Sequence, residues 1–206
     1  MLWRWGKSSD MDNRYEQLLD ILSTRHSCRR FSGEPVSEED IRKILDAAGR
    51  SPFASGRKNW KIAVIRDKEQ LKAIADCVRE QSVEISKGMD REAASMFLRY
   101  SSSFTFFENA AALFVPYCRE TATMNSLLGG QASEEINAWE HDNITKSLSC
   151  VAMLIILAAE SLNLGACYMT GPLMAGRQLN ASLGIKENFV IGALIPVGHK
   201  LEAYAD

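Results

Sequence analysis

An apolar run in the second half of the chain is the strongest constraint on the fold. Residues 151–159 (VAMLIILAA) carry no polar side chain and belong to a helical pattern that spans 139–164. A helix that is apolar on nearly all sides must be covered on most of them. The run lies between Lys146 and Glu160, and it is shorter than the about 20 apolar residues of a membrane span. We therefore predict a buried helix. A chain of 206 residues cannot easily cover such a helix on most sides by itself, which favours a dimer.

Composition and charge narrow the class of protein. The chain has 24 Lys and Arg against 26 Asp and Glu, a formal net charge of −2, and 46% hydrophobic residues. These values describe one globular domain long enough to bury a core, without the basic face that nucleic-acid binding needs. No nucleic-acid or membrane partner is expected.

Cysteine usage and the N-terminus bear on the compartment. The five cysteines are scattered and form no CxxC pair, so we interpret them as reduced thiols and expect no metal site. The N-terminus turns charged before an apolar stretch can form, which argues against a secretory signal. We predict a cytoplasmic protein with an N-terminal extension over 1–12, which contains Trp3 and Trp5, and a single domain over 13–206.

Hydrophobic periodicity predicts helices and strands mixed along the chain, an α+β fold. Ser37 is the expected N-cap of the second helix, since three acidic residues follow it directly. Gly165 is expected to end the long helix. Residues 51–59 are expected to be a loop. Residues 124–135 are expected to be a mobile excursion from the domain that can act as a lid. Helices are predicted at 14–23, 38–49, 68–84, 93–107, 139–164 and 174–183, and strands at 60–65, 110–118, 166–170 and 189–197.

The chemistry-bearing residues gather in one short segment. The sequence lacks the common dinucleotide, P-loop, metalloprotease and hydrolase motifs. What remains is the run 25–31 (RHSCRRF), in which guanidinium groups and a hydroxyl are suited to a phosphate and a carbonyl-bearing ring. A solvated basic turn between two helices is the alternative interpretation.

The motifs occur in an order that resembles the FMN-dependent nitroreductase family. They are RHSCRRF (25–31), PVSEEDIRKILDAAGRSP (35–52), NWKIAVI (59–65), LAAESLNLGACYMTGPL (157–173) and LIPVGHK (194–200), and the resemblance covers about residues 13–200. It implies a central mixed β-sheet flanked by helices, with a long buried helix at a homodimer interface that also holds FMN. It further implies NADH or NADPH as reductant, and ping-pong hydride transfer through flavin N5 to a nitroaromatic or quinone-like acceptor. The chemistry is then carried by FMN, without a dedicated catalytic residue.

The resemblance assigns roles to the basic segment. Arg25 and Ser27 would bind the phosphate and ribityl oxygens, and His26 would add a polar contact. Arg29 would lie near flavin N1 and the C2 carbonyl, where a positive charge stabilises the anionic reduced ring. Family members carry a C-terminal extension with a basic phosphate ligand, and Lys200 is the basic residue available for that role here.

Two further segments of the cofactor site follow from the resemblance. The loop 51–60 aligns with the family pattern A-P-S-x-x-N-x-Q-P-W, which approaches the flavin from the partner subunit, but it departs from the pattern at positions 53, 56, 58 and 59. The segment 169–171 would lay its backbone against the isoalloxazine, with Gly171 allowing close approach; a plain turn is the alternative. The residues implied are Pro52, Phe53, Ala54, Ser55, Gly56, Lys58, Met169, Thr170 and Gly171.

Other functions stay open at this stage. A specialised enzyme of the same fold would act as a dehalogenase, an enone or flavin reductase, or a flavin-cleaving enzyme. A non-catalytic FMN-binding protein is the second alternative, because the loop departs from the family pattern. The aromatic cluster of Met96, Tyr100, Phe104, Phe106 and Phe107 is interpreted as core, although members that line the flavin face would favour flat aromatic substrates.

Overall fold

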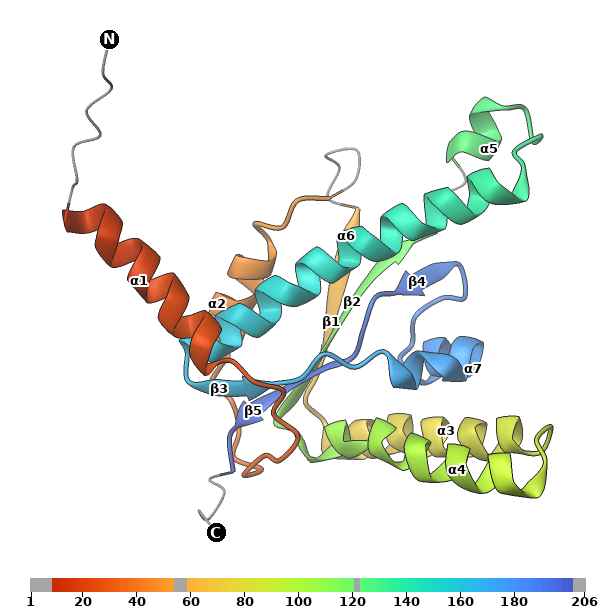
Figure 1. Cartoon of the computed structure of the whole chain (residues 1–206), viewed down its shortest axis with the longest axis horizontal. Coiled ribbons are helices and arrows are strands. Elements are labelled where there is room, and N and C mark those ends of the chain that lie inside the picture. The colour runs from red at the N-terminus through yellow and green to blue at the C-terminus, as the bar shows by residue number, and fades with distance from the viewer. Residues whose placement is uncertain (1–8, 54–58, 121–122, 202–206) are drawn as a thin grey trace.

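Helices cover both faces of a central sheet (Figure 1). The computed structural model describes residues 9–53, 59–120 and 123–201. Its α-helices are α1 (Ser9–Thr24), α2 (Glu38–Ala48), α3 (Lys68–Ser86), α4 (Arg91–Ser101), α5 (Thr123–Leu127), α6 (Glu134–Ser161) and α7 (Gly176–Ser182). Its strands are β1 (Trp60–Ile65), β2 (Ala112–Arg119), β3 (Leu164–Ala166), β4 (Phe189–Ile191) and β5 (Ile195–His199), and its 3-10 helices are η2 (Ser102–Phe104), η3 (Phe106–Asn109) and η4 (Gly171–Ala175).

The five strands formed by the described residues lie in the order β1-β2-β5-β3, with β4 paired to β2 beside β5. All pairs of these strands are antiparallel. The sheet is mixed only through an isolated parallel bridge between Ser27 and Ala166. The basic segment therefore lies against the edge strand β3.

The strand predicted at 189–197 is interrupted. Ile191 is opposite Tyr117, whereas Ile195 is opposite Phe114, so one side has an extra residue, as in a β-bulge. At the interruption a Cβ on Gly192 would lie 2.6 Å from the Cβ of Leu148 in α6. The bulge thus lets the chain pass directly under the long helix.

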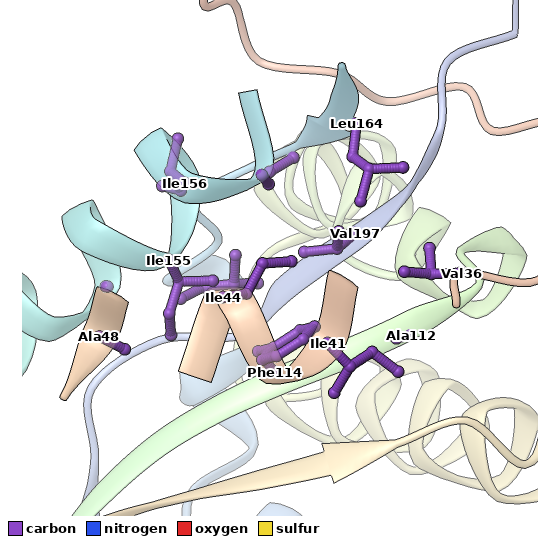
Figure 2. Packing of buried hydrophobic residues seen from close by; sticks show 14 of the residues in the cluster. Val36, Ile41, Ile44, Ala48, Ala112, Phe114, Ile155, Ile156, Leu164 and Val197 are labelled. Atoms are coloured by element: carbon purple, nitrogen blue, oxygen red, sulfur yellow. The ribbon is translucent and has the colours of Figure 1, made fainter. Parts of the chain in front are cut away.

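Side chains alternate across the sheet to make two cores. Figure 2 shows the core on one face, where Ile44 of α2 and Ile155 of α6 lie near Phe114 of β2. On the other face Leu113 and Val115 of the same strand pack with α3 and α7. This period of two is the strand pattern that an apolar, doubly covered sheet requires.

Most predicted elements are confirmed, with shifts at their ends. Ser37 is the N-cap of α2, and its Oγ accepts a hydrogen bond of 3.0 Å from the Asp40 amide. The helix predicted at 93–107 is α4 followed by the short helices η2 and η3, and the one predicted at 174–183 is η4 followed by α7. Helix α1 begins at Ser9, before the position where the domain was predicted to start. Trp3 and Trp5 lie outside the described residues.

The long helix begins and ends earlier than predicted. Ser133 is its N-cap, and it ends at Ser161. Asn163, with φ of 59°, takes the left-handed conformation that was assigned to Gly165. Gly165 instead lies in β3, where a Cβ would be 2.5 Å from the Cys28 Sγ. Close approach of the basic segment, and not a helix end, is why glycine occurs there.

The predicted burial of this helix is confirmed. Val151, Ile155 and Ala159 are fully buried, whereas Met153 is half exposed. By length and composition α6 also resembles a membrane span, but half of its most apolar 18-residue window is buried inside the fold. The core helix of a soluble protein meets the same criterion.

The excursion begins with a short helix held by α6. The carboxylate of Glu140, which is 8% exposed, accepts hydrogen bonds from the amides of Thr123 (2.8 Å) and Met124 (3.3 Å). The start of α5 is therefore tied to the first half of the long helix.

Candidate functional site

The basic segment is held on both sides by the sheet. The Cys28 amide donates to the carbonyl of Ala166 at 2.9 Å, and the Ser32 amide donates to the carbonyl of His199 at 3.0 Å. Phe31 also forms an isolated antiparallel bridge with Lys200. These backbone bonds fix residues 27–32 across β3 and the end of β5, so this segment is not a solvated turn.

The segment buries two apolar side chains, Cys28 and Phe31, and exposes the polar ones between and before them. Cys28 is 6% exposed and lies over Gly165, whereas Ser27 and Arg29 face solvent. The predicted polar ligands thus project away from the core on one side of the segment.

Arg25 and Ser27 line a cavity of about 230 Å³ together with α6 and the residues after β3. One end of the cavity offers a guanidinium and a hydroxyl, and the remainder is largely apolar. Such a surface is suited to a ligand with an anionic end and a flat apolar body. The other lining residues are Met153, Ile156, Ala166, Cys167 and Tyr168.

The electrostatics around Cys167 agree with this placement. Burial raises the pKa of the Cys167 thiol, and the positive charges of Arg29 and Arg25 and a hydrogen bond with Ser27 partly oppose the shift. The two guanidinium groups therefore lie close enough to act on the cavity wall. A buried thiol with a raised pKa stays protonated near neutral pH, so Cys167 is a wall and not a nucleophile.

Tyr168 is a site residue that the sequence analysis missed. It is 40% exposed, and its hydroxyl lies 3.2 Å from the Ser149 Oγ of α6. It also lines a second cavity of about 560 Å³, which includes Thr170, His141 and Glu120. A sequence signal for Tyr168 was available in the alternating pattern of this segment. Cys167 and Met169 are buried, whereas Tyr168 and Thr170 face outward, toward the cavities.

The segment 169–171 is rigidly attached to the sheet. Met169 and Leu194 exchange two backbone hydrogen bonds of 3.0 and 2.9 Å. A Cβ on Gly171 would lie 2.5 Å from the ring of Phe104. The sequence analysis did not predict this contact. A side chain at position 171 would collide with the Phe104 ring, which explains why glycine occurs there.

Several predicted ligands lie apart from the smaller cavity. His26 is exposed, with Nδ1 3.1 Å from the carbonyl of Thr24. The Lys200 ammonium donates to both carboxylate oxygens of Glu160 at 2.8 and 3.0 Å. A phosphate at Lys200 would have to displace Glu160, which is itself buried.

The predicted loop from the partner subunit is only partly described. Pro52 is exposed, and Phe53, like Trp60, packs against the core beneath α2 and α6. Phe53 thus serves its own subunit's core. Ala54, Ser55, Gly56 and Lys58 lie outside the described residues. Among the residues that are described, no group of three or more His, Cys, Asp or Glu side chains is placed to hold a metal ion.

The fold is an α+β sheet domain in which a basic segment is fixed beside a largely apolar cavity. Residues 22–199 of this domain match the Nitroreductase family. The chain belongs to this family, which indicates an oxidoreductase.

Curated relatives carry two kinds of name. A protein of Archaeoglobus fulgidus named as an NADH dehydrogenase/NAD(P)H nitroreductase is 28% identical over 189 residues, which cover 89% of this chain and 86% of the relative. Iodotyrosine deiodinase 1 of Rattus norvegicus is 23% identical over 193 residues, which cover 92% of this chain and 64% of the deiodinase. Both similarities span most of this chain, although the chain matches less than two thirds of the length of the deiodinase.

Solved structures share the fold. A BluB-like flavoprotein from Clostridium difficile 630 is 27% identical and has a TM-score of 0.79, with 92% of each chain covered. A nitroreductase with bound FMN from Desulfitobacterium hafniense is 19% identical and has a TM-score of 0.66, with 91% of this chain and 90% of that chain covered. The α+β nitroreductase fold expected from the motifs is thus confirmed.

Proposed function

We propose that this chain is an FMN-dependent oxidoreductase that uses NADH or NADPH to reduce a nitroaromatic or quinone-like acceptor. The observation that carries the proposal is the cavity that brings Arg25 and Ser27 next to Tyr168. Its donors match the parts of FMN: a cation for the phosphate, a hydroxyl for the ribityl chain and an aromatic ring for the isoalloxazine. The flavoprotein relatives and the family assignment support the same cofactor.

Each residue of the proposed site has a binding or orienting role. Arg25 would hold the phosphate, and Ser27 would bond the ribityl oxygens. Arg29 would place its charge near the pyrimidine end of the isoalloxazine. Tyr168 would pack its aromatic ring against the isoalloxazine. Because charge-assisted hydrogen bonds are the strongest of these contacts, the guanidinium groups would contribute most to affinity.

The redox chemistry would be supplied by the cofactor, with a hydride passing from NAD(P)H to the flavin and then to the acceptor. The protein would position the ring, exclude water from its buried face and favour the anionic reduced state through Arg29. Cys167 is given no part in the chemistry and would form part of the wall of the smaller cavity, because its thiol is buried.

A second copy of the chain would complete the site. The cavity of about 230 Å³ is smaller than the about 300–1,000 Å³ of ligand pockets, so it would hold only part of FMN. Next to it, Met153 is half exposed, and the apolar face of α1 is uncovered. We propose that the partner subunit covers these surfaces and brings its loop 51–60 toward the flavin.

The visible spectrum of the purified protein tests the proposed function. We expect a yellow protein whose flavin absorbance bleaches when NADH or NADPH is added without oxygen. A colourless protein that takes up no added FMN would contradict the proposal.

A matched pair of arginine variants tests the site itself. Arg25→Gln removes a charge from the cavity and is expected to weaken FMN binding about 10- to 100-fold, the effect of one charge-assisted contact. Arg30→Gln is the control, because Arg30 is exposed and its side chain does not line the cavity. Equal losses in the two variants, measured by flavin fluorescence titration, would mean that the segment acts only through its total charge.

A specialised reaction of the same site is the second candidate. It is favoured by the 23% identity with iodotyrosine deiodinase, over 92% of this chain. Incubation of the reduced protein with a halogenated phenol, followed by measurement of released halide, separates dehalogenation from nitro or quinone reduction. Stable FMN without oxidation of NAD(P)H would instead favour a non-catalytic flavin-binding protein.

A further inference from the structure

The aromatic cluster at the end of α4 divides into a buried and an exposed part. Phe107 is fully buried and Phe104 is 7% exposed, so both belong to the core. Tyr100 is 67% exposed and Met96 is 57% exposed. Large apolar side chains with this exposure, one helical turn apart, need a reason other than core packing.

The exposed part is connected to the segment that is proposed to support the flavin. The ring of Phe104 fills the space at Gly171, where a Cβ would lie within 2.5 Å of it. Tyr100 meets Phe104 edge to face, with ring centroids 4.9 Å apart at an interplanar angle of 81°. Met96 lies one turn before Tyr100 on α4. An apolar strip, defined as Met96, Tyr100 and Phe104, therefore runs outward from Gly171.

Positive charge flanks this strip. Arg91 and Arg99 line an open hollow of about 510 Å³ on the outer side of α4, together with Glu92, Ser95 and Met96. Neither guanidinium is hydrogen-bonded or ion-paired to another side chain in the part of the chain that the structure describes. With a single carboxylate against two guanidiniums, the hollow carries a net positive charge.

We propose that the strip and Arg99 dock the acceptor, and that they select flat aromatic acceptors bearing an acidic substituent. The inference rests on the proposed function, because the strip begins at Gly171, in the segment that is proposed to lie against the flavin. The aromatic ring of the acceptor packs against Tyr100 and Met96, and its carboxylate pairs with Arg99. Tyr100 thus determines specificity for the flat ring and Arg99 for the acidic substituent, and neither takes part in hydride transfer.

Ring packing at Tyr100 and the charge of Arg99 are expected to affect ligand affinity in different ways. Aromatic contact at Tyr100 acts on any flat ring, so its loss weakens neutral and acidic ligands alike. A guanidinium acts on the carboxylate only, and its effect is screened by salt. An exposed site of this kind gives modest changes in the dissociation constant, of about tenfold or less.

Equilibrium titration of the purified protein with two matched ligands tests the inference without turnover. The probes are 4-nitrobenzoate and 4-nitrobenzyl alcohol, which share the ring and the nitro group and differ in charge. Isothermal titration calorimetry without a reductant gives both dissociation constants for the wild type, Tyr100→Ala, Tyr100→Phe and Arg99→Gln. Leu98→Ala on the same helix and Arg42→Gln on α2 are the controls, since neither side chain belongs to the strip or the hollow.

We expect Tyr100→Ala to weaken both ligands about tenfold and Tyr100→Phe to stay within about twofold of the wild type. Arg99→Gln is expected to weaken 4-nitrobenzoate about fivefold, with no change for the alcohol, and this loss should vanish in high salt. The inference is overturned if Tyr100→Ala leaves both constants unchanged, or if it changes the oligomeric state in place of ligand affinity.

Failure of this inference can be told apart from failure of the proposed function. A protein that binds FMN and is bleached by NAD(P)H, but whose ligand affinities ignore Tyr100 and Arg99, keeps the function and loses the docking strip. In a protein without FMN the same titration still reports on the strip, since it needs no flavin chemistry. Residue-specific losses there support an aromatic-acid site, and their absence overturns it.

Discussion

Helices α1 and α2 have the same kind of apolar pattern, but the apolar face of α2 is buried and that of α1 is exposed. In α2, Ile41 and Ile44 lie against α6 and the sheet and are 6% and 0% exposed. In α1, Leu18 and Leu22 are 47% and 45% exposed, although they are also one turn apart. Helix α1 leaves the body of the molecule, as Figure 1 shows, and contacts α6. An amphipathic period therefore identifies a face that must be covered, but not what covers it.

The largest expected effect is on α1. Leu18→Glu combined with Leu22→Glu puts two charges on the face that we propose is covered by a second subunit. Burying them unpaired would weaken the dimer by about 4 kcal/mol, or about a thousandfold. Sedimentation analysis should show monomers with unchanged helical circular dichroism.

The control for this experiment is Gln17→Glu, which adds a charge to the polar face of α1. It should leave the oligomeric state unchanged. A wild-type protein that is already monomeric at micromolar concentration would contradict the proposal that a second subunit covers the apolar face of α1.

The next effect is on α2 and concerns folding instead of assembly. Ile44→Ala removes a fully buried side chain, and it is expected to lower the free energy of unfolding by about 3 kcal/mol through lost burial and a residual cavity. Urea denaturation measures the change. Leu19→Ala in the monomeric Leu18→Glu, Leu22→Glu variant should cost less than about 1 kcal/mol, since the Leu19 side chain is 39% exposed. Equal costs would break the comparison.

A smaller effect tests the start of α2. Ser37→Ala removes the side-chain oxygen that accepts from the Asp40 amide, so we expect a loss of about 1 kcal/mol in stability. Ser37→Thr restores both the acceptor and the hydroxyl that donates to the Asp40 carboxylate at 2.7 Å, and should recover most of the loss. Thermal unfolding of the two variants side by side decides whether the cap or the bulk of the residue matters.

The smallest effect concerns the ion pair between Arg66 and Glu38 at the first turn of α2. Both side chains are exposed, so Arg66→Gln is expected to cost no more than about 0.5 kcal/mol, and less in high salt. A loss as large as that of Ile44→Ala would mean that surface electrostatics, and not burial, holds α2 in place.

The fold predicted from the sequence is confirmed, whereas the arrangement of the candidate site depends on contacts that only the tertiary structure shows. Local signals worked where a feature is set within a few residues, as at Ser37 or in the alternation of β2. They failed at Gly165, because Cys28, the neighbour that requires a glycine there, is far away in sequence. For the same reason no local signal could predict that Lys200 pairs with Glu160. The family resemblance located the basic segment, but it did not point to Tyr168, whose role depends on two cavities meeting at its ring.

By itself the sequence determined the periodic elements, the N-cap of α2, the deep burial of α6 and the motif order of the nitroreductase family. Each of these depends on hydrogen bonds and side-chain spacing within one or two turns, or on the total apolar surface that must leave water. Only the tertiary structure decided that Glu160 holds Lys200, that Arg25 shares a cavity with Tyr168, and that the face of α1 stays uncovered in one subunit. These are contacts between distant segments, and no local pattern specifies which surfaces meet.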